Sequence, residues 1–214
     1  MTKSLALIAL LAFASACAST GAANDQPRFR EGQSVVSRAD PVIRVNVDRN
    51  LPFLGETEGV VMRGHATAHQ YWFADIQDGQ LQRAVVVHFE RMNEGSDFTF
   101  EYPTFRMEQF GAQSYLHQSF TGPNCELFSE EVRALLAARG ATARQDCLMT
   151  RYVRAVTDDK RAEIIFFYVE PAEGVPEEPE GMAPGGIPTG ADTPWGIEDA
   201  RLTQALRSLV HIED

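Results

Sequence analysis

Hydrophobic and polar positions alternate along much of the middle of the chain. In 42–48 the apolar residues Ile43, Val45 and Val47 alternate with polar ones. Residues two apart share a face of a β-strand, so this pattern predicts a strand with one solvated face. Similar alternation or enrichment in β-branched and aromatic residues predicts further strands at 67–76, 81–92, 98–102, 112–120, 149–158 and 162–170.

Two local features organise these strands into a sheet. Asp78-Gly79 separates 67–76 from 81–92 and is typical of a tight β-hairpin turn. The segment 164–169 is apolar at every position, which predicts a central strand buried on both faces. The turn and the apolar segment together predict an antiparallel meander whose central strand is covered on both faces.

In two places the spacing of apolar residues changes from that of a strand to that of a helix. Ser129 can cap a helix that runs to Gly140, with Val132, Leu135 and Leu136 on one stripe. Thr193 and Pro194 suit the start of a second helix, over 194–211. These elements predict an α+β fold, an antiparallel sheet of about six or seven strands with two helices on one face.

The N-terminus has the pattern of an export signal. The apolar run 5–14 is about half the ~20 residues that a membrane-spanning helix needs. Ala14-Ser15-Ala16-Cys17 follows it and resembles a bacterial lipobox. The resemblance implies that 1–16 is a signal peptide and that Cys17 is acylated and inserts into a lipid bilayer. The alternative is a soluble periplasmic protein that is cleaved beside a cysteine.

The resemblance also implies a location. Ala18, rather than an aspartate, follows the cysteine, which in the enteric sorting pattern favours the outer membrane. We therefore expect the chain in the cell envelope, facing the periplasm. Residues 17–41 lack periodicity and are predicted to form the lipidated N-terminus and a flexible tether.

The remaining chain, 42–214, is predicted to be a single domain. It is interrupted at about 170–194 by an acidic segment rich in proline and glycine, for which we expect a disordered loop. Cys125 and Cys147 remain after Cys17 is assigned, and in an oxidising compartment such a pair predicts a disulfide. A metal or redox pair is the alternative, but the C-x-x-C spacing typical of both is absent.

The charge excludes one class of partner. The net charge is −11, and an acidic protein repels phosphate backbones, so we expect no nucleic-acid partner.

Candidate chemistry is sparse. His65 and His69 would lie roughly 13 Å apart on a strand, too far to share an ion, and His88 and His117 lie on other predicted strands. No G-x-S-x-G motif surrounds Ser114, Ser119 or Ser129, and Gly185-Gly186 is not part of a phosphate-binding loop. The acidic pair Glu130-Glu131 is interpreted as negative charge at the start of the helix. The sequence therefore predicts no catalytic residue, metal site or cofactor.

The predicted strands are rich in aromatic side chains, and this favours binding. Trp72 should point away from Tyr71 and Phe73, so that one set builds the core and the other is available to line a groove or dock a partner. The alternative is that most of these aromatic residues are core on both sides of a partly covered sheet. The first hypothesis is a non-catalytic protein-interaction module with a periplasmic or outer-membrane partner. The alternatives are a lipid- or small-molecule-binding module with a pocket between sheet and helices, and an unrecognised hydrolase.

Overall fold

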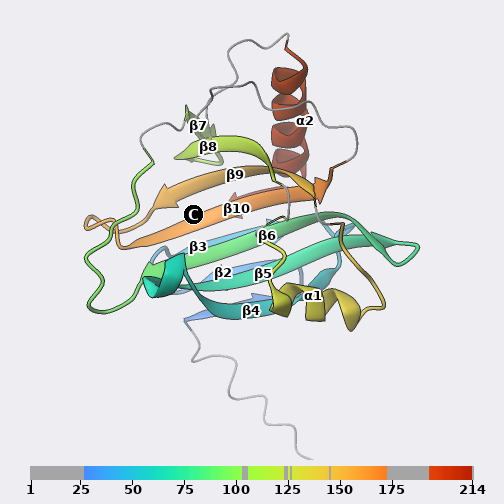
Figure 1. Ribbon diagram of the computed structural model, residues 1–214. Coiled ribbons are helices and arrows are strands. Elements are labelled where there is room, and N and C mark those ends of the chain that lie inside the picture. Colours follow the sequence, from blue (N-terminus) through green and yellow to red (C-terminus); the bar gives the residue numbers. More distant parts are fainter. Residues whose placement is uncertain are drawn as a thin grey trace, which may run out of the picture.

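The computed structural model describes residues 27–102, 106–122, 125, 127–144, 146–172 and 193–213. These residues form two antiparallel sheets and two α-helices, a mostly β fold (Figure 1). The large sheet has the strand order β4-β5-β6-β10-β9-β8-β7 and the small sheet the order β1-β2-β3-β11.

The strands of the large sheet are β4 (Phe53–Val61), β5 (Ala66–Gln77), β6 (Gln80–Met92), β7 (Arg106–Phe110), β8 (Gln113–Gly122), β9 (Cys147–Ala155) and β10 (Ala162–Pro171). Those of the small sheet are β1 (Arg28–Glu31), β2 (Ser34–Ser37), β3 (Ile43–Val47) and β11 (Val210–Glu213). The helices are α1 (Glu130–Ala137), α2 (Pro194–Leu209) and a short 3-10 turn, η2 (Met62–Gly64).

Two meanders, β4-β5-β6 and β7-β8-β9-β10, join along β6 and β10 to make the large sheet. The predicted hairpin turn is present, with φ of 51° at Asp78 and 71° at Gly79. These left-handed values suit the twist of a two-residue hairpin. The fully apolar strand β10 lies at the centre of the sheet, as its sequence predicts.

Alternate residues of each strand supply two separate cores. Tyr71, Phe89 and Phe166 belong to one, and Trp72, Val86 and Phe167 to the other. The first core lies between the large sheet, the small sheet and α2. The second lies under α1. The predicted opposition of Trp72 to Tyr71 and Phe73 is therefore confirmed.

The two helices cover opposite faces of the large sheet, so the prediction that they share one face is wrong. Val132 and Leu136 of α1 pack in the core with Trp72, whereas Leu202 and Leu206 of α2 pack in the core with Tyr71. The apolar stripe of a helix shows which of its own sides is buried, and it carries no information about the face of the sheet that receives it.

Both predicted helix caps are present. The Val132 amide donates to Ser129 Oγ at 3.4 Å, and the Gly196 amide donates to Thr193 Oγ1 at 3.0 Å. Helix α1 lies close to β4 because Gly55 has no side chain: a Cβ there would lie 2.6 Å from Leu135 Cδ2.

The small sheet corrects the predicted boundaries at both ends of the domain. Strands β1 and β2 lie within the segment 17–41 assigned to a tether, and Val35 is fully buried. The C-terminal helix ends at Leu209, and β11 pairs with β3. The predicted signal peptide, Cys17 and residues 173–192 of the predicted acidic loop lie outside the described residues.

The segment 98–102 is not a strand, against prediction. Phe98 is 51 % exposed, while Phe100 packs in a small cluster with Ala66 and Met92. The Phe100 amide donates to the Lys160 carbonyl outside any strand ladder. The alternation in 98–102 therefore reflects packing contacts of individual side chains. It does not produce a strand, because a strand also needs a neighbouring strand that supplies ladder hydrogen bonds.

Cys125 and Cys147 are at disulfide-bonding distance, with Cα atoms 5.6 Å apart. Cys147 begins β9, and Cys125 precedes α1, so the bridge joins the helix segment to the sheet as the sequence predicts. Among the described helices, none has the length and apolar character needed to span a membrane.

Candidate functional site

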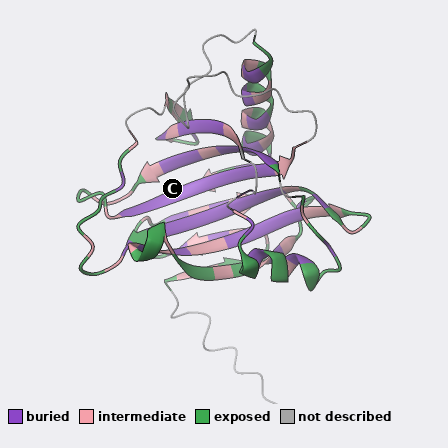
Figure 2. Ribbon diagram, viewed as in Figure 1, coloured by how far each residue is buried: buried purple, intermediate pink, exposed green. Residues whose placement is uncertain are grey.

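A cavity of about 300 Å³ opens on the face of the large sheet that carries α1. Buried positions continue along β6, β10 and β9 beyond the corner of the large sheet that α1 covers (Figure 2). The cavity is lined by Val61, Met62, Gln70, His88, Glu90, Tyr102, Phe120, Leu127, Met149, Arg151, Glu163, Ile165 and Phe167. Apolar walls around a few convergent polar groups are typical of small-molecule sites.

A hydrogen-bond relay orients the first acid of the cavity, Glu90. Trp72 Nε1, which can only donate, lies 3.1 Å from Gln70 Oε1, so the amide nitrogen of Gln70 faces His88 Nδ1 at 3.0 Å. Nδ1 must then accept, which leaves the proton of the neutral imidazole on Nε2. Nε2 lies 2.9 Å from Glu90 Oε2 and donates to it.

The second acid, Glu163, is opposite Glu90 in the register of β10 against β6. Its side chain is almost fully buried, and the Tyr102 hydroxyl lies 2.8 Å from both carboxyl oxygens. Burial raises the pKa of Glu163 to about 8, and the facing Glu90 contributes to the rise. Two carboxyls side by side disfavour double ionisation, so this pair retains a proton near neutral pH.

One carboxyl oxygen of the pair is unsatisfied. Glu90 is 7 % exposed, and its Oε1 atom has no hydrogen-bond partner among the described residues. An unpaired buried acceptor costs about 1–3 kcal/mol, more when it is charged. Because Glu90 lines the cavity, its carboxyl group is a candidate contact for a ligand donor.

Arg151 is the basic residue of the cavity wall. Its Nε and NH2 atoms donate to Gln118 Oε1 at 3.1 and 2.7 Å. Its guanidinium lies over the rings of Phe120 and Tyr102, 5.2 and 5.8 Å from their centroids. The wall therefore already contains a cation held against aromatic faces.

The chemistry available in the cavity is acid–base exchange and recognition of a hydrogen-bond donor. None of the described lining residues is a serine, threonine or cysteine that could act as a nucleophile. Within the part of the chain that the structure describes, no three His, Cys, Asp or Glu side chains are grouped to hold a metal ion.

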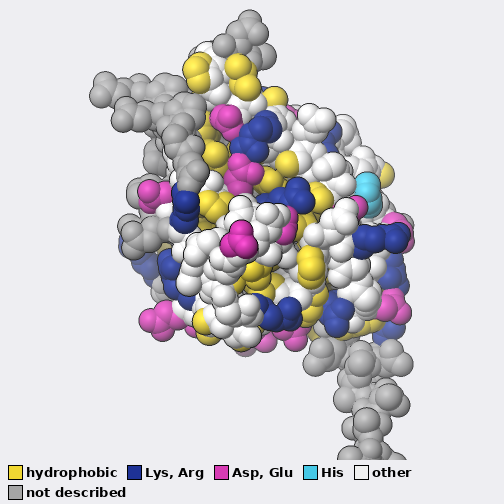
Figure 3. Space-filling view, turned by 90° about the vertical axis from the view of Figure 1, so that its right-hand side faces the viewer, with side chains coloured by type: hydrophobic (Ala, Val, Ile, Leu, Met, Phe, Trp, Pro, Cys, Tyr) yellow, Lys and Arg dark blue, Asp and Glu magenta, His cyan; other side chains and the backbone are white. Residues whose placement is uncertain are grey.

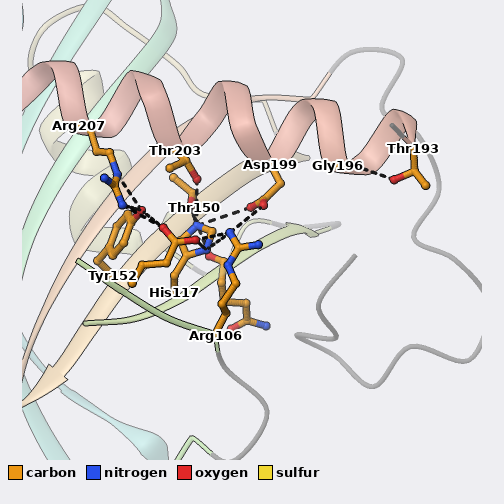
Figure 4. Close-up of polar contacts among 11 residues, drawn as sticks. Arg106, His117, Thr150, Tyr152, Thr193, Gly196, Asp199, Thr203 and Arg207 are labelled. Atoms are coloured by element: carbon orange, nitrogen blue, oxygen red, sulfur yellow. Dashed lines mark hydrogen bonds and ion pairs between the residues drawn. The ribbon is translucent and has the colours of Figure 1, made fainter. Parts of the chain in front are cut away.

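A second polar cluster lies between α2 and β7, β8 and β9 (Figure 4). His117 Nε2 lies 2.9 Å from Thr150 Oγ1 and 3.0 Å from Thr203 Oγ1, and Arg106 donates to Nδ1 at 3.0 Å. Burial lowers the pKa of His117, against the opposing influence of Asp199. The imidazole is held by groups of the protein itself.

The other charged members of this cluster also pair with one another. Tyr152 donates to Glu108 at 2.6 Å, and Arg207 donates to both. Arg106 pairs with Glu108 and Asp199. We interpret the cluster as the polar contact that docks α2 on the sheet.

A larger hollow, of about 490 Å³, lies at the β4 edge on the other face. Its lining includes Arg28, Glu56, His69 and Arg91. Arg28 donates to the Asp40 carbonyl and lies over the Phe89 ring, and His69 pairs with Glu56 at 3.5 Å. The Arg28 Nε atom has no hydrogen-bond partner among the described residues, but none of these four side chains is buried. This hollow is therefore a weaker candidate than the cavity around the buried Glu90 and Glu163.

The four histidines considered as candidate ligands lie in different parts of the structure. His65 contacts the Phe98 ring at a tilted angle, His69 lines the β4-edge hollow, His88 lines the cavity and His117 lies under α2. The Glu130-Glu131 pair is at the start of α1, as predicted, and is exposed.

Sequence reasoning missed Glu90 and Glu163. A signal was present, because Glu163 directly precedes the apolar run 164–169, and Val86, His88 and Glu90 share one face of β6. A run of polar residues on one face of a long strand indicates that the face is open to solvent or to a ligand.

Comparison of the chain with protein-family models, with curated proteins and with solved structures gives no significant match. The function is therefore inferred from the geometry of the chain's own residues.

Proposed function

We propose that this chain is an exported, lipid-anchored protein whose folded body binds a small molecule in the cavity around Glu90. The observation that carries the proposal is the buried Glu90 carboxylate, which a relay through His88 orients and whose Oε1 atom lacks a partner among the described residues. Hydrophobic walls and a fixed polar group together provide affinity and orientation for a ligand.

The observations give less support to a protein-interaction module. Apart from Val60 and Met62, which are two residues apart, the large apolar side chains that are at least 45 % exposed come from separate segments of the chain: Val42, Val60, Met62, Phe98, Met107 and Ile197. Such residues scattered singly need no partner to explain them. Acidic and basic side chains are interspersed on the side of the molecule shown in Figure 3, which gives no single-sign docking patch there.

An acid–base hydrolase is the second candidate function. It is favoured by the protonated Glu163 beside the oriented Glu90 carboxylate, since hydrolysis by two carboxyl groups needs one acid and one base. Mass spectrometry of each ligand after incubation with the protein separates the two functions. An unchanged ligand supports binding, and a cleaved one supports the hydrolase.

The two tryptophans provide a test of the binding site. Trp72 Nε1 donates into the relay that ends at Glu90, whereas Trp195 lies in the core on the other face of the sheet. In ¹H–¹⁵N spectra of the full-length protein in detergent, a ligand from a small-molecule library should shift the indole signal of Trp72 and leave that of Trp195 unchanged. Shifts confined to Trp195, or the absence of any ligand that shifts Trp72, would refute the proposed site.

The proposed anchor has its own test. Cys17→Ser removes the thiol that the lipobox resemblance assigns to acylation. The variant should leave the membrane fraction or remain unprocessed, and labelled palmitate should no longer be incorporated. Ser19→Ala, which retains Cys17 and leaves the disulfide intact, is the matched control for a substitution in this segment. Undiminished labelling of the Cys17→Ser variant would contradict the anchor.

A further inference from the structure

We infer that the ligand of the Glu90 cavity is a small organic cation, an ammonium group attached to a compact apolar body, which binds between Glu90 and Glu163 and displaces one proton from that pair. This inference rests on the proposed function and adds to it the chemical class of the ligand and its linkage to protons.

The first argument is the arrangement of the two acids. Glu90 and Glu163 face each other across β6 and β10, and both are more than nine-tenths buried. Glu90 Oε2 accepts a hydrogen bond from His88, and Glu163 accepts one from Tyr102. Glu90 Oε1 has no hydrogen-bond partner among the described residues. An ammonium group has several N–H donors and can contact both carboxylates at once. Hydrogen bonds between ionised partners are roughly twice as strong as neutral ones.

The second argument is the charge balance of the cavity. The titratable or charged groups that line it are His88 and Glu90 from β6, Glu163 from β10, Arg151 from β9 and Tyr102. Gln70 of β5 and Gln118 of β8 are neutral, and His88 Nδ1 accepts a hydrogen bond from the Gln70 amide. Arg151 then balances one ionised acid of the pair while the other stays protonated. A bound ammonium ion adds a positive charge, and the release of that proton restores neutrality.

The third argument is the apolar wall. Phe120, Phe167, Ile165, Leu127 and Met149 surround the acids and can receive an apolar body. The aromatic rings also attract cations, as the position of Arg151 over Phe120 shows. A metal ion is a poorer fit, since no group of three ligating side chains occurs among the described residues.

The proton step has a definite direction. The proton leaves a carboxyl of the pair for the solvent, and the ammonium N–H groups take its place as donors. Because burial raises the pKa of Glu163 to about 8, this proton is present in the empty cavity at neutral pH. Affinity for an ammonium ion should therefore rise with pH, by about tenfold per pH unit between pH 6 and pH 7 if one whole proton is released.

Titration calorimetry of the full-length protein in detergent tests the inference, with 2-phenylethylammonium as probe and neutral 2-phenylethanol as its control. In two buffers of different ionisation enthalpy, the ammonium probe should release about one proton per molecule bound. Glu90→Gln should weaken its binding by about tenfold or more. Glu58→Gln, at an exposed position on the opposite face, should leave binding unchanged.

A second variant separates proton linkage from a purely structural role. Glu163→Gln removes the titrating group. The ammonium probe should therefore still bind at Glu90, but its affinity should be independent of pH between pH 6 and pH 7 and no proton should be released.

If 2-phenylethanol binds as tightly as the ammonium probe and releases no proton, the cation inference is wrong and the proposed function stands. If magnesium or calcium ions compete with the probe, the cavity is a metal site. If neither probe binds and no library compound shifts Trp72, the proposed function fails as well.

Discussion

Replacing Glu163 with glutamine should abolish most of the loss of stability that the wild-type protein shows between about pH 5 and pH 8. The folded-state pKa of Glu163 is raised to about 8 by burial, so the folded state holds more protons than the unfolded state between the normal glutamate pKa and that value. Stability therefore falls as pH rises through this window. Each unit of pKa shift corresponds to about 1.4 kcal/mol, so the loss amounts to a few kcal/mol.

Glutamine retains the shape of the protonated acid and cannot ionise. We expect Glu163→Gln to resemble the wild type at pH 5 and to be a few kcal/mol more stable at pH 8, because the wild-type acid must ionise while buried. Urea unfolding at intervals of pH measures the difference, and comparison of the two curves cancels the other titrating groups. Glu94→Gln, at an exposed position, controls for loss of a carboxyl. Parallel curves for wild type and Glu163→Gln would show that Glu163 is ionised in the folded protein.

Removing the disulfide should give the second large effect. The sequence separation of Cys125 and Cys147 is 22 residues, and closing such a loop contributes about 3 kcal/mol by restricting the unfolded chain. Both cysteines are buried in an apolar core, so alanine is the cleaner replacement for the pair, because serine adds a buried hydroxyl. Cys125→Ala with Cys147→Ala should lower the free energy of unfolding by about 2–5 kcal/mol.

The loss should begin at α1, because this helix buries only Val132 and Leu136 completely. Hydrogen exchange should show early loss of protection at the α1 amides, such as that of Ala138, while the β6 and β10 amides stay protected longer. Wild-type protein treated with a thiol reductant is the control, because it opens the bridge without changing any side chain other than the two cysteines. Simultaneous loss of protection in α1 and the sheet would show that the bridge stabilises the whole fold and does not act locally.

Much of the large sheet could be predicted from the chain because its signals are local. Strands β5, β6, β9 and β10 have patterns that residues two apart determine, and the Asp78-Gly79 turn and both helix caps depend on a few adjacent residues. Strand β4 (Phe53–Val61) was missed because its sequence contains Gly55, Gly59 and three polar residues. It becomes a strand because β5 offers a free edge with which it pairs.

The candidate site could not be predicted for a different reason. Glu90 and Glu163 are brought together by the pairing of β6 with β10, which are not consecutive strands. Periodicity shows which residues share a face, but the strand order and register decide which residues become neighbours. The sequence places His88 and Glu90 on one face of β6, and only the pairing with β10 adds the second acid.

The sequence by itself determined the strands with clear alternation, the central position of β10, the separation of Trp72 from Tyr71, and the partner of Cys125. Each of these depends on neighbours along the chain or on the small number of possible pairings. Only the tertiary structure decided that α1 and α2 lie on opposite faces, that β1 and β2 close the first core, and that two acids meet in one cavity. These outcomes depend on contacts between residues far apart in the chain, where burial of apolar surface, rather than local conformational preference, selects the arrangement.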